Sequence, residues 1–139
     1  MNRKLCVLHV KSETIILVMG IKLVIVDDAP FIREAIRGII KGTDIELLAE
    51  ACDGEEAIVV AGRTQPDVIL MDMVLPKKNG IDAAKEILEN NSKIKIIACS
   101  TEGQEGLLLR ALDAGCVNFI TKPFKAEDIM KAIRKAGSK

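Results

Sequence analysis

The chain has 139 residues, and its 20 lysine and arginine residues balance its 20 aspartate and glutamate residues, so the formal net charge is zero. This length fits a single domain that is large enough to bury a core without disulfide bonds. The zero charge argues against nucleic-acid binding through bulk positive charge. Because only 2% of the residues are aromatic, with no Trp and no Tyr, stacking sites for bases, flavins or sugars are disfavoured.

The first twenty residues differ from the rest of the chain. Their two apolar runs, residues 5–8 and 15–21, are too short to cross a bilayer, and no small-residue cleavage site follows, so we expect neither export nor membrane insertion. We predict an N-terminal extension of unknown role at residues 1–20, of which residues 1–18 are dispensable for folding, and one domain at residues 21–139. The alternative is that residues 5–10 add a strand or a self-association surface.

The cysteines are spread along the chain without a C-x-x-C pair, and His9 is the lone histidine. This pattern favours reduced thiols and a cytoplasmic location over a zinc site or a disulfide framework. The four residues are Cys6, Cys52, Cys99 and Cys116.

From residue 21 onward, apolar runs predict the strands of a sheet. The runs at residues 23–26, 68–71, 94–99 and 117–120 show little polar alternation, which is typical of strands covered on both faces. Residues 45–50 differ, because Glu46 and Glu50 fall on one face of the expected strand. That pattern indicates a half-exposed strand at the edge of the sheet.

Apolar residues between these runs recur with helical spacing and predict five helices. Pro30 suits the first turn of the first helix and Gly42 its end, while Asp53 and Glu56 resemble a capping box before the second. Gly115 ends the fourth helix. The stripes are Ile32, Ala35, Ile36, Ile39 and Ile40, then Ile81, Ala84, Ile87 and Leu88, then Leu107, Leu108, Ala111 and Ala114, and finally Ile129, Ala132, Ile133 and Ala136. Alternating strands and helices predict an α/β fold of (βα)5 type, a doubly wound five-stranded parallel sheet with helices on both faces.

Polar residues follow the four apolar runs at the ends of the expected strands. They are Asp27, Asp28, Asp72, Ser100 and Lys122. Ligands of open α/β sheets bind outside the carboxyl ends of the strands. If the first and third strands are neighbours, about 4.8 Å apart, the three carboxylates converge there.

This set of residue types indicates phosphoryl-transfer chemistry. Crowded carboxylates attract a cation, and an all-oxygen site in an open crevice suits Mg²⁺. A lysine and a serine supply a positive charge and a hydroxyl donor for phosphoryl oxygens. Any one of these residues alone is more simply a cap or turn residue, and Asp28 could cap the first helix. Only the ordered combination favours a site.

Four segments of the sequence together resemble the response-regulator receiver family, closest to its CheY-like single-domain members. They are residues 23–28 (LVIVDD), 71–76 (MDMVLP) with Gly80, 96–100 (IIACS) and 119–124 (FITKPF), and the resemblance runs from about residue 21 to residue 136. It implies a flavodoxin-like sheet with strand order 2-1-3-4-5. It also implies that the chain is a switch of a two-component system and that a histidine kinase phosphorylates it.

The resemblance assigns the acidic residues their roles. Asp72 would be the phospho-acceptor and a ligand of Mg²⁺. Asp27 and Asp28 would hold the same ion, together with the backbone carbonyl of Val74.

The resemblance also assigns the residues that bind the phosphoryl group and report its arrival. Ser100 and Lys122 would contact the phosphoryl group, and the bond between Lys122 and Pro123 would be cis. Phe119 would be the aromatic switch residue, although plain core packing is an equal alternative for its ring.

Three residues near the expected site would modify how the phosphoryl group is bound or lost. Thr101 stands where the family usually has a small residue, so its bulk would narrow access to the phosphoryl group or its hydroxyl would compete with Ser100. Val74 is apolar where some members have a polar side chain that orients water, which predicts slow self-dephosphorylation. Glu102 could still influence that water, and Leu109 is a candidate partner contact.

The expected function is regulation by protein contact, through the surface of the fourth helix, fifth strand and fifth helix. The expected partners are a sensor histidine kinase, a CheA-like kinase among the candidates, a downstream protein target and a candidate phosphatase. We do not expect a turnover enzyme. The alternatives within the family are a phosphorelay intermediate and a degenerate receiver that only scaffolds. Two alternatives belong to other classes: a flavodoxin-like electron carrier and a haloacid dehalogenase-type phosphatase. The phosphatase requires a second Asp at the position where this chain has Val74.

Overall fold

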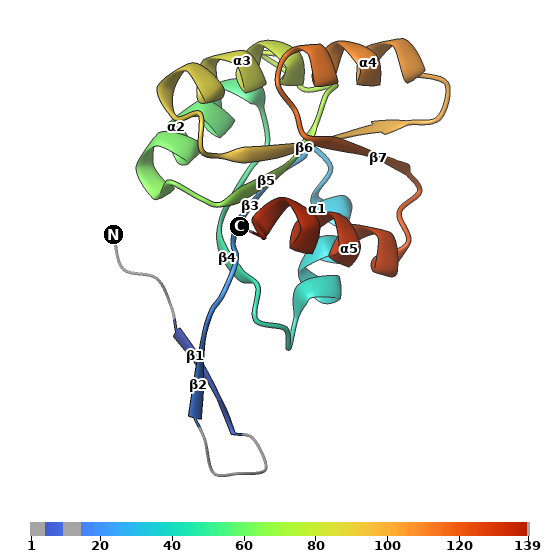
Figure 1. The fold of residues 1–139 in the computed structure, drawn as a ribbon. Coiled ribbons are helices and arrows are strands. Elements are labelled where there is room, and N and C mark those ends of the chain that lie inside the picture. Colours follow the sequence, from blue (N-terminus) through green and yellow to red (C-terminus); the bar gives the residue numbers. More distant parts are fainter. Residues whose placement is uncertain (1–4, 10–14, 139) are drawn as a thin grey trace.

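The computed structural model describes residues 5–9 and 15–138, which form two separate sheets (Figure 1). The larger sheet has five parallel strands in the order β4-β3-β5-β6-β7. Its strands are β3 (Lys22–Val26), β4 (Glu46–Ala51), β5 (Val68–Asp72), β6 (Lys95–Thr101) and β7 (Asn118–Lys122). Counted from β3, this is the order 2-1-3-4-5 of a flavodoxin-like fold, so the expected fold is confirmed.

One helix follows each strand of this sheet. The helices are α1 (Pro30–Ile40), α2 (Gly54–Thr64), α3 (Gly80–Asn90), α4 (Glu105–Asp113) and α5 (Ala126–Gly137). Figure 1 shows α2, α3 and α4 over one face of the sheet, and α1 and α5 over the other. The sheet is therefore the middle of three layers, and both of its faces are covered.

Two hydrophobic clusters, one on each face, explain why the central strands are apolar throughout. In β3, Val24 and Val26 pack into the cluster that includes α2, α3 and α4, while Leu23 and Ile25 pack into the cluster with α1 and α5. Successive side chains of a strand point to opposite faces, so burial on both faces requires apolar residues at every position. Strand β4 pairs only with β3 and is mostly half-buried, which confirms the predicted edge strand.

The helix ends follow the predicted signals, whereas one residue of the predicted apolar stripe of α1 does not. Asp53 caps α2 by accepting a hydrogen bond from the Glu56 N–H (2.7 Å), and the Glu56 carboxylate accepts one from the N–H of Cys52 (2.9 Å). Pro30 lies in the first turn of α1. Ala35 is exposed, so its place in the predicted buried stripe is wrong. It lies at the border of a stripe whose centre is formed by larger side chains such as Ile36.

The strands β1 (Leu5–His9) and β2 (Ile15–Met19) form an antiparallel hairpin that precedes the larger sheet. Figure 1 shows it projecting away from that sheet. Residues 5–9 form a strand, but it pairs only with β2 in a sheet of its own and does not extend the five-stranded sheet; residue 10 lies outside the described residues. The role of the hairpin and its dispensability stay predictions. In the described part of the chain, no helix has the length and apolar character that a membrane span requires.

Gly80 brings the start of α3 against the end of β5. Its N–H donates to the carbonyl of Met73 (2.9 Å), and a Cβ at this position would lie 2.5 Å from the carbonyl oxygen of Asp72. No real Cβ approaches an oxygen so closely, and the obstacle is backbone, so it cannot rotate away. The close contact fixes the backbone at Asp72.

Replacing Gly80 by Ala is therefore expected to destabilise the protein. Overpacking of this kind costs about 1–3 kcal/mol, which urea denaturation measures as a fall in the free energy of unfolding. Gly62→Ala is the matched control, because Gly62 is an exposed residue of α2 with no heavy atom within 4 Å of an added Cβ. The control should match the wild type or gain about 1 kcal/mol. Equal stability of the two variants would contradict the tight packing of α3 on β5.

Candidate functional site

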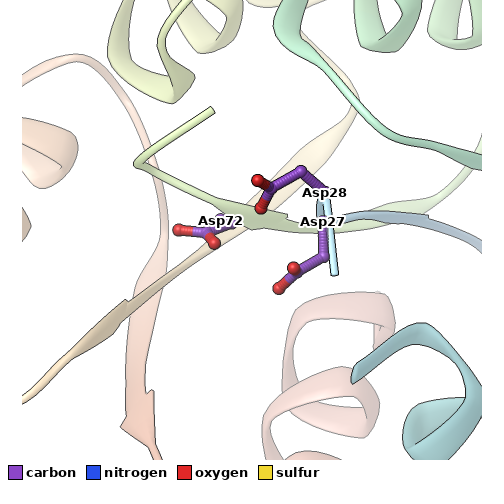
Figure 2. Close-up of side chains that lie close together, drawn as sticks. All are labelled: Asp27, Asp28 and Asp72. Carbon is purple, nitrogen blue, oxygen red and sulfur yellow. The ribbon is translucent and has the colours of Figure 1, made fainter. Parts of the chain in front are cut away.

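Three carboxylates meet at the carboxyl ends of β3 and β5. Val26 and Met71 pair in these neighbouring strands, so Asp27 and Asp72, which follow them, lie side by side. One oxygen each of Asp27, Asp28 and Asp72 lies within 4.8 Å of the others (Figure 2). Asp27 and Asp72 are buried and Asp28 is exposed. The predicted convergence of the three acidic residues is confirmed.

Lys122 joins two of these carboxylates from the end of β7. Its Nζ donates to Oδ2 of Asp27 (2.7 Å) and to Oδ2 of Asp72 (3.0 Å). Burial lowers the pKa of Lys122, but the hydrogen bonds to the two carboxylates outweigh burial and raise this pKa above its ordinary value. The ammonium is therefore charged at neutral pH and offsets part of the negative charge of the crevice.

The Asp72 carboxyl combines burial with donors on both oxygens. Burial raises the pKa of Asp72, and the nearby charge of Asp27 adds to the rise. Two hydrogen bonds lower this pKa and offset only part of the rise: one from the Val74 N–H to Oδ1 (2.9 Å), and one from Lys122. The result is a partly desolvated carboxylate that is more basic than an ordinary aspartate, which favours its use as a nucleophile.

Asp27 is held by backbone and side-chain contacts on three sides. Its Oδ1 accepts a hydrogen bond from the N–H of Ala29 (2.9 Å). Its backbone carbonyl accepts one from Nη1 of Arg33 (2.6 Å), and Nε of Arg33 donates to Glu50 on β4 (2.9 Å). The N-cap of α1 is Ala29, and no side chain makes a capping hydrogen bond there. The alternative that Asp28 caps α1 is therefore wrong. Figure 2 shows the Asp28 carboxyl on the side of Asp72.

Arg33 is the residue that the sequence alone did not identify. It links α1 to the edge strand and positions the loop that carries Asp27 and Asp28, which follow β3. Its partner at the site is a backbone carbonyl, which no pattern of residue types reveals. The one available signal was an arginine on α1 together with Glu50 on a half-exposed strand.

Ser100 and Thr101 end β6 close to this crevice. Ser100 is buried, and its Oγ donates to the carbonyl of Thr101 at 3.4 Å, a long and weak hydrogen bond. Thr101 is exposed, and its hydroxyl donates to Oε1 of Gln104 (3.0 Å). The Thr101 hydroxyl is thus engaged with Gln104 in this structure, and its effect on access to a phosphoryl group stays a prediction. Glu102 is exposed.

Phe119 lies on β7, an edge strand of the sheet, with 42% of its surface exposed, so the expectation that residues 117–120 are covered on both faces is wrong. This exposure overturns the alternative that its ring is a plain core residue. Val74 is also exposed, at 53%, and its N–H donates to the side chain of Asp72. The peptide bond between Lys122 and Pro123 is cis, as the resemblance implied.

The donor set of the crevice fits a small divalent cation. Asp27, Asp28 and Asp72 offer carboxylate oxygens that are close enough together to share one ion. Oxygen ligands, with one side of the site open to water, are the environment that Mg²⁺ prefers. Among the described residues, these three form the one group of at least three potential ligands.

Comparisons with known proteins agree with this geometry. The sequence matches the response regulator receiver domain over residues 23–134. It is 39% identical over 116 residues to the chemotaxis protein CheY of Listeria monocytogenes, covering 84% of this chain and 98% of that protein. It is 40% identical over 117 residues to CheY of Thermotoga maritima, with the same coverage.

Solved structures give the same result. The response regulator domain of Thermotoga maritima CheB superposes with a TM-score of 0.77 at 34% identity, covering 85% of this chain and 96% of that one. The receiver domain of the Pseudomonas aeruginosa sensor histidine kinase PA1611, which has a magnesium ion coordinated in its active site cleft, superposes with a TM-score of 0.76 at 30% identity, covering 86% and 99%. The chain therefore belongs to the response regulator receiver domain family, whose members are phosphorylation-regulated switches of two-component signalling.

Proposed function

We propose that Asp72 accepts a phosphoryl group from a phosphohistidine of a sensor kinase, in the presence of Mg²⁺, and that the phosphorylated chain regulates a protein partner in a chemotaxis-like pathway of the cytoplasm. The observation that carries this proposal is the contact of Lys122 with both Asp27 and Asp72, beside the exposed carboxylate of Asp28. These groups supply a nucleophile, a metal site and a cation for phosphoryl oxygens in one crevice.

The chemistry follows from the positions of these groups. Magnesium held by Asp27, Asp28, Asp72 and the carbonyl of Val74 would supply positive charge to the phosphoryl oxygens. A carboxylate oxygen of Asp72 attacks phosphorus in line as the bond from phosphorus to the histidine nitrogen breaks, and that nitrogen keeps the electron pair. The Lys122 ammonium leaves its carboxylate partners in part to pair with the new phosphoryl oxygens. The protein thus acts by positioning and charge neutralisation.

The new dianionic group changes the balance of contacts at the ends of β6 and β7. Ser100 carries a hydroxyl with one weak partner, so it can rotate to donate to a phosphoryl oxygen. Lys122 and Phe119 lie on the same strand, three residues apart. A shift of Lys122 toward the phosphoryl group therefore couples directly to the strand that carries the exposed ring. Phosphorylation biases two packings of this region that differ by a few kcal/mol.

The output surface proposed here comprises α4, β7 and α5, which are the fourth helix, fifth strand and fifth helix of the domain. A groove beside β7 is lined by Phe119, Thr121, Lys131 and Lys135, and Asp128 contributes one acidic side chain. On α4, Leu109 is 63% exposed. Two lysines beside an exposed aromatic ring fit a target segment that carries acidic side chains and an apolar anchor.

Alternative functions have less support. A haloacid dehalogenase-type phosphatase needs an acid two residues after the nucleophile, where this chain has the exposed Val74. A scaffold without chemistry would not need Lys122 placed between two buried carboxylates. We therefore propose a switch that is not a turnover enzyme. Its self-dephosphorylation is slow, because the apolar Val74 cannot orient water, and a separate phosphatase is a candidate partner.

The acceptor residue is tested by intact mass spectrometry after incubation with acetyl phosphate and Mg²⁺. The wild type is expected to gain one phosphoryl group, and Asp72→Asn none, because an amide is not a nucleophile toward phosphorus. Asp113→Asn, which removes an exposed carboxylate of α4, is the matched control and should be phosphorylated normally. An equal gain in the wild type and in Asp72→Asn would place the acceptor elsewhere.

The metal site is tested by thermal unfolding during a magnesium titration. A ligand that binds only the folded state at ten times its dissociation constant stabilises a protein by about 1.4 kcal/mol, seen as a rise in Tm. Asp28→Asn removes one of the three carboxylates without disturbing a buried hydrogen bond, so it should reduce this rise strongly. Asp113→Asn should retain it. A rise of the same size in Asp28→Asn would exclude this crevice as the magnesium site.

The role of Lys122 is tested with Lys122→Ala. This variant should still accept phosphate on Asp72, at a reduced rate, because the nucleophile and the carboxylates remain. It should fail to change conformation, because the cation that follows the phosphoryl group is missing. Comparing the amide NMR shifts of β7 and α5 before and after phosphorylation measures this response. Shift changes as large as those of the wild type would refute the role given to Lys122.

A further inference from the structure

The side chain of Gln104 holds the end of β6 through two hydrogen bonds. Its Oε1 accepts one from the N–H of Thr101 (3.2 Å) and one from the Thr101 hydroxyl (3.0 Å). A backbone N–H can only donate, so the atom that faces it must be the amide oxygen of Gln104. The two bonds join the last residue of β6 to the residue that precedes α4.

This use of Gln104 differs from that of the equivalent residues of the neighbouring helices. The N-caps of α2 and α3, Asp53 and Asn79, accept hydrogen bonds from the first turns of their own helices. Gln104 is the N-cap of α4, yet its side chain makes no cap hydrogen bond and turns back to Thr101. The turn between them contains Gly103 at φ +88°, a backbone conformation that favours glycine. The loop is thus built around the contact with Thr101.

The contact lies directly beside the residue that binds the phosphoryl group. Thr101 follows Ser100, and Thr101 pairs with Lys122 in the register of β6 and β7. Movement of Ser100 toward a phosphoryl group on Asp72 pulls on the Thr101 N–H and hydroxyl, which Gln104 holds. Breaking the two bonds is favourable only when new contacts with the phosphoryl group replace them.

We propose that Gln104 is a positioning residue that holds the loop between β6 and α4 in its unphosphorylated arrangement and so sets how strongly phosphorylation must act to switch the protein. This rests on the proposed phosphorylation of Asp72. The contact opposes the phosphorylated arrangement, and its loss moves the equilibrium toward that arrangement before any phosphoryl group is present. The threshold of the switch is then a property of Gln104 and Thr101 as well as of Ser100 and Lys122.

The experiment measures the affinity of the full chain for beryllofluoride, a non-covalent phosphoryl mimic, at saturating Mg²⁺. Gln104→Met keeps the length of the side chain and removes the acceptor, so it should bind beryllofluoride about fivefold more tightly than the wild type, the effect of one net hydrogen bond. Gln104→Ala should do the same. Asp113→Asn, an exposed residue of α4 outside this contact, is the matched control, with unchanged affinity. Thr101→Val keeps only the N–H donor and should fall between the wild type and Gln104→Met.

Hydrogen exchange of the Thr101 amide without beryllofluoride gives a second readout, which does not depend on phosphoryl chemistry. Exchange should be faster in Gln104→Met than in the wild type, and unchanged in Asp113→Asn. Wild-type affinity or weaker binding in Gln104→Met, or unchanged exchange of the Thr101 amide, would overturn the role of Gln104. A wild type that does not bind beryllofluoride at all would instead contradict phosphorylation of Asp72.

Discussion

The ionic contact of Lys122 with Asp27 and Asp72 is the interaction on which the rest of the site depends. Two buried carboxylates side by side repel each other, and burial disfavours the charged form of Asp72. A single ammonium that donates to both offsets this repulsion in the absence of a metal ion. A buried charge cluster of this kind contributes little to stability. Its value is that the same groups are ready to exchange partners when a cation and a phosphoryl group arrive.

The fold provides the rigidity that this arrangement needs. Strands β3 and β5 are buried on both faces, so the ends that carry Asp27 and Asp72 cannot drift apart without opening a core cluster. On one side, Gly80 lets the start of α3 pack closely against the backbone of Asp72. Arg33 ties the carbonyl of Asp27 to the edge strand from the other. By contrast, the loop after β6 is held by polar contacts at the surface, which makes it the part of the site best suited to move.

Much of the fold and of the site could be predicted from the sequence, because the apolar runs end at the polar residues that carry the chemistry. The placement of Asp27 and Asp72 followed from that pattern once their strands were neighbours. Side-chain partners were a different matter. Arg33 donates to a backbone carbonyl, and Gln104 accepts hydrogen bonds from Thr101 instead of from the first turn of α4. Both contacts depend on distances between separate elements, which residue spacing does not encode. The N-terminal hairpin was anticipated only in its first strand, because residues 11–14 (KSET), which separate the two apolar runs, contain no Asn-Gly or Asp-Gly signal of a hairpin turn.

A crystal structure of the full chain grown with magnesium and beryllofluoride tests the central claim most directly. The account predicts an ion between Asp27, Asp28 and Asp72, beryllofluoride on the Asp72 carboxylate, and Nζ of Lys122 within hydrogen-bond distance of a fluorine. A structure in which the crevice holds neither group, while Lys122 still bridges the two buried carboxylates, would contradict it.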